Sequence, residues 1–93
     1  MTQEDAAYYA ILKRFLGPPK WIAPSRTVLG DLRPTAVLEL TIAADGRVLG
    51  ARIVESSGNV SMDNSVKRLI KVLDRVPAPP HGELTVLVDM EVD

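Results

Sequence analysis

The amino-acid sequence predicts an α+β domain with its elements in the order helix, strand, strand, helix, strand. Residues 36–55 alternate apolar and polar side chains on both sides of Asp45-Gly46, a pattern that indicates a β-hairpin. Residues 62–73 place apolar side chains at helical spacing, and residues 84–92 alternate strictly again. The second helix is too long for a hairpin connection, so we expect it to cross over the sheet before the last strand begins.

The order of these elements also predicts the topology of the sheet. The crossover helix carries the chain over the first hairpin strand and sets the last strand beside it, by a right-handed connection. The expected sheet has three strands, in the order 2-1-3 when they are numbered along the chain. Each outer strand is antiparallel to the central first strand, and we describe the sheet as antiparallel or mixed. In this sheet the last strand is parallel to the second. We expect both helices to pack on one face and the last strand to form an edge.

Residues 2–16 are predicted to form the first helix. Thr2 can cap its start, and Glu4 and Asp5 suit the positive end of the helix dipole. Gly17 followed by two prolines is a stop signal. The apolar stripe expected to pack on the core consists of Ala7, Tyr8, Ile11, Leu12 and Phe15.

Residues 18–35 show no regular period and contain several prolines. We therefore expect them to form a loop that wraps the domain. Trp21, the only tryptophan, is expected to pack against one end of the hydrophobic core rather than bind a partner. Val28, Leu29 and Leu32 are the other side chains expected to pin this loop.

The hairpin turn determines which side chains face each other across the two strands. We favour a two-residue turn at Asp45-Gly46. Under this turn the apolar pairs are Ile42 with Leu49, Leu40 with Ala51, and Leu38 with Ile53. The same register sets Glu39 opposite Arg52, an opposite-charge pair on the wetter face. The alternative is a three-residue loop, residues 44–46, with a bulge, and it would shift those partners by one.

The second helix is expected to start at Ser61 or Asp63, after residues 56–59 end the strand, and to finish near Arg75. Its predicted buried face consists of Met62, Val66, Leu69, Ile70 and Leu73. Charged residues occupy the opposite face, namely Lys67, Arg68, Lys71, Asp74 and Arg75. Acids dilute this basic face and no aromatic residues interleave with it, so we interpret it as solvated.

Composition excludes several classes of function. The chain has 93 residues and a net charge of −1, which gives no reason to expect nucleic acid or an anionic membrane as partner. It has no cysteine, so no disulfide framework supports the fold. No stretch is long and apolar enough for a membrane span, and no signal sequence is visible. If the protein is exported or anchored, this chain is a fragment that lacks that part.

No residues form a recognisable catalytic, cofactor-binding or metal-binding constellation. His81 is the single histidine and has no second ligand at metal-binding spacing. Ser56 and Ser57 lack the pattern of an activated nucleophile, and we expect them to end a strand and cap a helix. Asp89 and Glu91 lie on one strand face, where charges protect an edge strand against aggregation. We therefore predict that the chain is not an enzyme and needs no cofactor.

Several motifs, in their order, resemble the C-terminal domain of TonB and TolA, the energy-transducing proteins of Gram-negative envelopes. The resemblance lies in ADGRVLGARIVESSGN, with a DGRV turn and a strand ending in SSG, then in MDNSVKRLIKVL and in PAPP before the last strand. Upstream, Tyr8-Tyr9 leading to Trp21 and Pro24 is similar to the TolA-like branch. The resemblance covers residues 8–93.

Three departures leave the TonB-like and TolA-like branches both open. Arg33-Pro34 stands where TonB-type domains often have tyrosine-proline, the cysteine pair of some TolA domains is missing, and the last strand lacks a closing aromatic residue. From length and element order we expect one TonB/TolA C-terminal-like domain over residues 1–93, divided into the helix of residues 1–17, the wrapping loop of residues 18–35 and the ββαβ core of residues 36–93.

The resemblance also implies a function. The domain would lie on the periplasmic side of the inner membrane, tethered through an N-terminal anchor outside this chain. It would bind an outer-membrane receptor or a periplasmic protein by strand addition and transmit force from an inner-membrane motor. The predicted partner-binding edge consists of Thr85, Val86, Leu87, Val88, Asp89, Met90 and Glu91. The alternative is a self-association module, a homodimer whose edge strand pairs only with its own copy.

Overall fold

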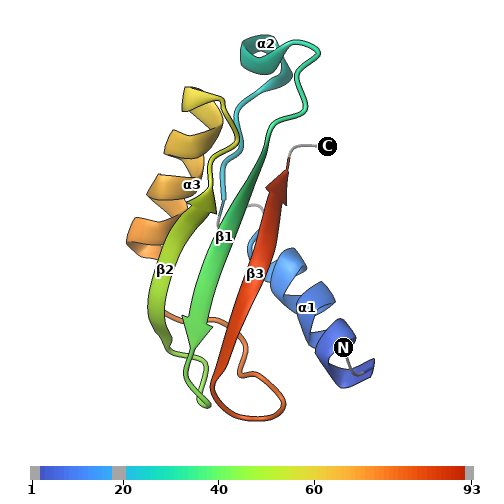
Figure 1. Cartoon of the computed structure of the whole chain (residues 1–93), viewed down its shortest axis with the longest axis vertical. Coiled ribbons are helices and arrows are strands. Elements are labelled where there is room, and N and C mark those ends of the chain that lie inside the picture. The colour runs from blue at the N-terminus through green and yellow to red at the C-terminus, as the bar shows by residue number, and fades with distance from the viewer. Residues whose placement is uncertain (1–2, 18–20, 92–93) are drawn as a thin grey trace.

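The computed structural model describes residues 3–17 and 21–91. The elements are α1 (Gln3–Phe15), α2 (Arg26–Leu29), β1 (Thr35–Ile42), β2 (Val48–Glu55), α3 (Val60–Val72) and β3 (Leu84–Glu91). The strands form one sheet in the order β2-β1-β3, with β1 antiparallel to both neighbours (Figure 1). The predicted α+β class, element order and strand order are confirmed, and α2 is a short additional helix in the wrapping loop.

Helices α1 and α3 both pack on the same face of the sheet, as predicted. The alternate side chains of β1 on this face, from Ala36 to Ile42, are fully buried. They belong to one hydrophobic core with Leu12 of α1 and Val66 of α3. In Figure 1, α3 lies on the β2 side of β1, whereas α1 lies on the β3 side. The opposite face of the sheet carries the polar or exposed side chains, and none of the described helices lies over it.

Helix α1 is rotated relative to the predicted stripe. Its buried side chains are Tyr8 and Leu12, joined by Leu16 just beyond its end, whereas Ala7 and Ile11 are exposed. The Tyr8 hydroxyl donates a hydrogen bond of 2.7 Å to the Pro77 carbonyl, and this distant contact fixes the rotation. Burial raises the pKa of Tyr8. The predicted cap, Thr2, lies outside the described residues.

The wrapping loop is pinned by fewer side chains than expected. Trp21 and Leu29 are buried, as predicted. Val28 and Leu32 are 61% and 57% exposed, so the prediction that these two side chains pin the loop was wrong. For Val28 the reason is α2, because successive helical residues point in different directions and Leu29 is the one that faces the core. Leu32 lies beyond the end of α2. Ser25 opens this turn by accepting hydrogen bonds from the backbone of Val28 and Leu29.

The hairpin has the three-residue loop, so the preferred two-residue turn was wrong. Gly46 N–H donates to the Ala43 carbonyl at 2.9 Å, and Ala43 N–H donates to the Arg47 carbonyl at 2.8 Å. The residue at the third loop position must adopt positive φ, which Gly46 does at 96°. Ile42 therefore pairs with Val48 and not with Leu49.

The remaining pairs are nevertheless those predicted: Leu38 with Ile53, Glu39 with Arg52, and Leu40 with Ala51. A bulge between Thr41 and Ile42 restores this register, because Leu49 is left as the extra residue on β2. Leu49 is 52% exposed instead of facing the core. The longer loop and the bulge thus compensate each other.

Helix α3 begins at Val60, earlier than expected, because its cap is Asn59. The Asn59 side chain accepts a hydrogen bond of 2.9 Å from Met62 N–H. Asp63, one of the two predicted starts, instead accepts hydrogen bonds from Ser56, and from the hydroxyl and N–H of Ser57 at 2.6 and 3.0 Å. These bonds lower the pKa of Asp63 and hold the end of β2 against α3. The predicted apolar face of α3 is confirmed.

Candidate partner-binding edge

Strand β3 lies at the edge of the sheet and pairs with β1 without interruption. The register runs over eight residue pairs, from Thr35 with Glu91 to Ile42 with Leu84. Val88 and Met90 are buried in the core, whereas Leu87 on the opposite face is 54% exposed. Within residues 3–17 and 21–91, no strand lies on the outer side of β3.

The direction of the backbone groups of β3 follows from two contacts of Asp89. Its N–H donates a hydrogen bond of 3.4 Å to Tyr9 Oη, and its carbonyl accepts a hydrogen bond from Lys13 Nζ. Both partners belong to α1, on the far side of β3 from β1. The backbone polar groups of Asp89 therefore point outward from the sheet.

The direction of the backbone groups of the other β3 residues follows from that of Asp89. Because backbone groups alternate along an antiparallel edge, those of Thr85 and Leu87 also point outward, whereas those of Val86 bond to β1. The hydroxyls of Thr85 and Thr41 are 3.3 Å apart, as expected for the closer, non-hydrogen-bonded type of pair. Among the described residues, no hydrogen-bond partner is found for the outward groups of Thr85 and Leu87.

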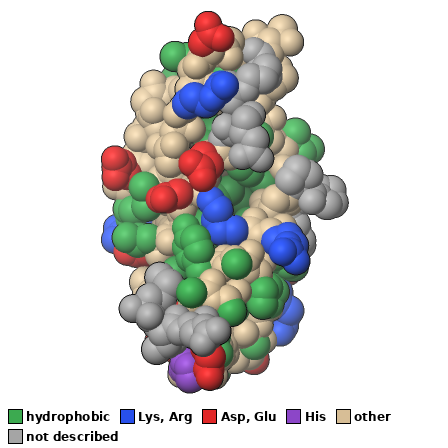
Figure 2. Space-filling model, turned by 90° about the vertical axis from the view of Figure 1, so that its right-hand side faces the viewer, with side chains coloured by type: hydrophobic (Ala, Val, Ile, Leu, Met, Phe, Trp, Pro, Cys, Tyr) green, Lys and Arg blue, Asp and Glu red, His purple; other side chains and the backbone are tan. Residues whose placement is uncertain are grey.

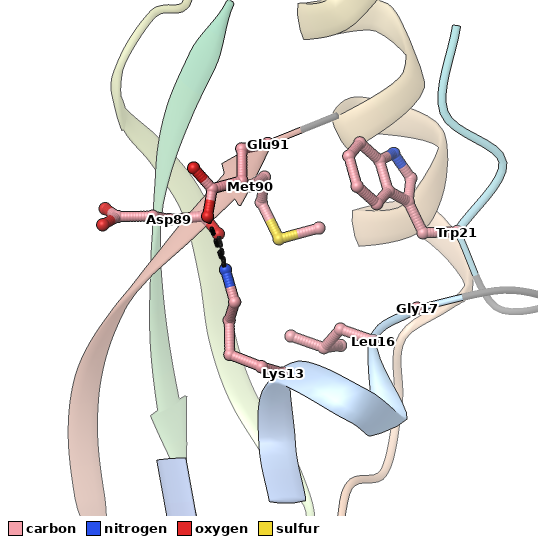
Figure 3. Close-up of a pocket in the computed structure, with 7 residues that line it drawn as sticks. All are labelled: Lys13, Leu16, Gly17, Trp21, Asp89, Met90 and Glu91. Carbon is pink, nitrogen blue, oxygen red and sulfur yellow. Dashed lines mark hydrogen bonds and ion pairs between the residues drawn. The ribbon is translucent and has the colours of Figure 1, made fainter. Parts of the chain in front are cut away.

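Helix α1 covers the other end of this edge. Lys13 reaches the Asp89 carbonyl and also lies 3.7 Å from the Glu91 carboxylate (Figure 3). Beneath this contact is a small pocket of about 200 Å³, into which Met90 and Leu16 point and which Trp21 closes. The Trp21 side chain is buried, and its indole N–H has no hydrogen-bond partner among the residues that the structure describes. We name the contacts of Tyr9 and Lys13 with Asp89 and Glu91 the α1 latch.

A groove of about 430 Å³ separates the start of α1 from the open end of β3. Its lining is mostly apolar and consists of Asp5, Tyr8, Tyr9, Leu84, Thr85, Val86 and Leu87. Figure 2 views the molecule from this side and shows hydrophobic side chains exposed between charged ones. The groove therefore lies directly beside Thr85 and Leu87, whose backbone groups point outward and meet no partner in the described part of the chain.

The structure divides the seven residues predicted for the edge into two sets. By alternation from Asp89, the residues that direct backbone groups outward are Thr85, Leu87, Asp89 and Glu91. Val86, Val88 and Met90 turn their side chains toward the core. Sequence reasoning missed Tyr9 and Lys13, although their spacing of four residues places them on one side of a helix. No local signal shows that this side meets the last strand, because the contact joins residues about 80 positions apart.

The side chains considered for chemistry are not brought together. His81 pairs with Glu4, at 2.8 Å, and contacts neither serine. Ser56 and Ser57 donate to Asp63, where they fix a turn. No group of acidic or histidine side chains within the described parts of the chain could hold a metal ion. The candidate site therefore consists of outward backbone groups on β3 beside a mostly apolar groove.

These features define a small α+β interaction domain with one regular, partly open edge strand. The chain belongs to the TonB C-terminal family, which matches it over residues 5–92. Domains of this family are parts of TonB-like energy transducers and interact with other proteins. The predicted resemblance is confirmed.

Comparison of structures gives a consistent fold. The C-terminal domain of HasB superposes with a TM-score of 0.53 and 21% sequence identity, covering 97% of this chain and 69% of that one. At this identity the likeness concerns the fold. No match is found among curated proteins. In the part of the chain that the structure describes, no helix is long and apolar enough to cross a membrane.

Proposed function

We propose that this domain captures a protein partner by strand addition to β3, and that it is the periplasmic end of a TonB-like transducer. The observation that carries the proposal is the outward direction of the backbone groups of Thr85 and Leu87 on an uninterrupted edge strand. Such groups form hydrogen bonds with any extended segment that lies alongside them. The role is binding, and we propose no catalysis.

The proposal accounts for how force could be transmitted. A partner strand held along β3 is bonded through β1 to the rest of the sheet, because β3 is paired over its whole length. The core under β1 then joins the sheet to both helices. Tension that arrives through a membrane-anchored linker would reach the partner through backbone hydrogen bonds and not through mobile side chains.

A pair of proline substitutions tests strand addition. Proline lacks an N–H, so Leu87→Pro removes an outward donor, whereas Val86→Pro removes a donor to β1. We expect Leu87→Pro to retain the fold but lose binding of a lysine-flanked peptide of alternating valine and threonine. We expect Val86→Pro to unfold the domain, because proline inside a paired strand removes a ladder hydrogen bond to β1. Binding would be measured by calorimetry and stability by thermal unfolding.

The other edge of the sheet supplies the matched control. Glu39 pairs with Arg52, and alternation then directs the N–H of Ala51 outward from β2. Ala51→Pro removes an equivalent donor on the edge that we do not propose as the site. It should leave peptide binding unchanged. A folded Leu87→Pro variant that binds the peptide as the wild type does would contradict strand addition to β3.

The alternative of self-association makes a different prediction for the same edge. If β3 pairs only with its own copy, the wild type should be a dimer at micromolar concentration and should take up no peptide. Leu87→Pro should then convert it to a monomer. Sedimentation velocity of both proteins distinguishes the two functions.

A further inference from the structure

The edge of β3 is not uniform, and the difference bears on the kind of partner. Toward its start, Thr85 and Leu87 direct backbone groups outward beside the groove. Toward its end, both backbone groups of Asp89 are already bonded to Tyr9 and Lys13. A partner strand that ran along the whole of β3 would have to displace these bonds. A strand opposite Thr85 and Leu87 alone would displace none.

The groove determines which partner side chain fits. In a paired strand, residues directly opposite each other place their side chains on the same face. The partner residue opposite Val86 would therefore point to the helix-covered face, where Val86 and the ring of Tyr9 line the groove. Its neighbours, opposite Thr85 and Leu87, would lie on the open face. An apolar side chain is required only at the central position.

Charge also favours one type of partner. Glu83, Asp89 and Glu91 lie on or next to β3, and no basic residue occurs between residues 83 and 91. Lys13 is the cation of the α1 latch and is already placed against Asp89 and Glu91. Lys13 contacts the Glu91 carboxylate but only the backbone carbonyl of Asp89. Basic residues flanking the partner segment would complement the carboxylates of Glu83 and Asp89, whereas acidic residues would be repelled.

We propose that the partner segment is short, pairs with Thr85 and Leu87, inserts one apolar side chain beside Val86, and ends at the α1 latch. This inference rests on the proposed function and adds to it the chemistry and the register of the partner. The α1 latch acts as a stop, because Tyr9 and Lys13 occupy the groups that the next partner residue would need. A longer partner strand would pair further only after α1 released Asp89.

Two lysine-flanked peptides test the stop. The short one contains threonine, valine and threonine, and the long one repeats this alternation over the length of β3. In the wild type we expect both to bind equally and to shift the NMR signals of the Thr85 and Leu87 amides, but not that of Asp89. In the Tyr9→Phe, Lys13→Met double variant the long peptide should bind about tenfold tighter than the short one, as two competing hydrogen bonds are removed. It should then also shift the Asp89 amide.

Arg14→Met is the matched control, since Arg14 lies on α1 next to Lys13 and is exposed. It should leave the two peptides equal. Replacing the central valine of the short peptide by aspartate should abolish binding, whereas replacing a threonine by lysine should preserve it.

Different failures have different meanings. If the long peptide binds the wild type more tightly and shifts Asp89, the stop is wrong while strand addition stands. If the aspartate peptide binds as well as the valine peptide, the apolar position is wrong. If neither peptide shifts Thr85 or Leu87, strand addition itself is wrong and the inference falls with it. The wild-type comparison decides the stop even where the double variant does not fold.

Discussion

The two edge strands of the sheet, β2 and β3, are built differently. Strand β3 keeps one register over all eight of its pairs with β1. The register of β2 shifts twice, between Thr41 and Ile42 and between Val37 and Leu38 on its partner β1. Bulges of this kind twist an edge and interrupt its row of hydrogen-bonding groups. The β2 edge is therefore a poorer template for another strand.

The start of β2 is also closed by the chain itself. Val48 N–H donates to the Asp74 carbonyl at 3.0 Å, and Val76 N–H donates to the Gly46 carbonyl at 2.9 Å. A bridge between Arg47 and Arg75 lies between these two bonds. The segment after α3 thus occupies the outer side of β2. Within residues 3–17 and 21–91, the backbone contacts on the outer side of β3 are those of the α1 latch.

The two edges show how a small sheet can close one edge strand and leave the other regular and partly open. Both edges carry outward N–H and carbonyl groups, and an open edge promotes aggregation. Bulges and a returning segment protect β2, the edge that we do not propose as the binding site. On β3, acidic side chains and the α1 latch restrict access without breaking the register. Substitutions in α3, the hairpin loop, the end of β2 and the open face test what keeps the two edges distinct.

The largest effect on the free energy of unfolding is expected from a substitution in α3, because this helix joins both edge strands to one core. Leu69 is 2% exposed, and Leu69→Ala should cost about 2–5 kcal/mol of unfolding free energy. Lys71→Ala, on the solvated face of α3, should cost at most about 0.5 kcal/mol. Denaturant unfolding measures both. Hydrogen exchange should show β2 and β3 losing protection together, and loss in β2 alone would mean that the edges unfold independently.

A smaller effect is expected where the hairpin loop meets the segment after α3. Gly46 has a φ of 96°, and a Cβ there would lie 2.3 Å from the Val76 carbonyl oxygen. Gly46→Ala should therefore cost at least about 1–2 kcal/mol and expose the start of β2 to hydrogen exchange. Gly50→Ala is the control, because a Cβ at Gly50 meets nothing within 4 Å. Equal costs at the two glycines would show that the contact with Val76 does not protect β2.

The end of β2 should respond to pH through Asp63. Its pKa is lower in the folded protein than the value of about 3.9 expected when unfolded, so its carboxylate stabilises the fold above that value. This contribution is lost as pH falls through the folded pKa. Asp63→Asn should melt below the wild type at neutral pH, with the gap in Tm closing in acid. The exposed Asp31→Asn should change Tm little, and a gap constant with pH would contradict the assignment to Asp63.

The smallest effect is expected on the open face. Arg52 Nε lies 3.0 Å from Glu39 Oε1, but the Arg52 side chain is 72% exposed. A double-mutant cycle to alanine should give a coupling of about 0.2–1 kcal/mol, because solvent screens exposed pairs. Zero coupling would mean that this pair does not help to hold β2 in register. Partner capture on β3 should be unaffected in all three variants.

Sequence reasoning succeeded where a pattern is local. The alternation in β3 and the spacing in α3 predicted the buried faces of both elements, because an amphipathic segment can bury only its apolar side. Helix α1 shows the limit of the same argument. Its apolar residues form a broad stripe, and the rotation that left Ile11 exposed depends on the Tyr8 contact with Pro77.

The sequence predicted which strand forms the candidate site, but not which of its residues direct hydrogen-bonding groups outward. Elements and connection lengths by themselves determined the strand order, and hence that the last strand lies at an edge. Which residues of that strand direct hydrogen-bonding groups outward stayed undetermined, because a shift of one residue exchanges the two sets. The contacts of Asp89 with Tyr9 and Lys13 decide it.

The α+β class, the 2-1-3 order and the family could all be predicted from the sequence, since they depend on periodicity, connection length and motif order. The three-residue hairpin loop, where Gly46 packs against Val76, and the bulge that restores the register beyond it became clear only from the fold. The same is true of α1, which closes one end of β3 and leaves a groove at the other. These features are contacts between residues distant in the chain, and no local pattern encodes the distance between two surfaces.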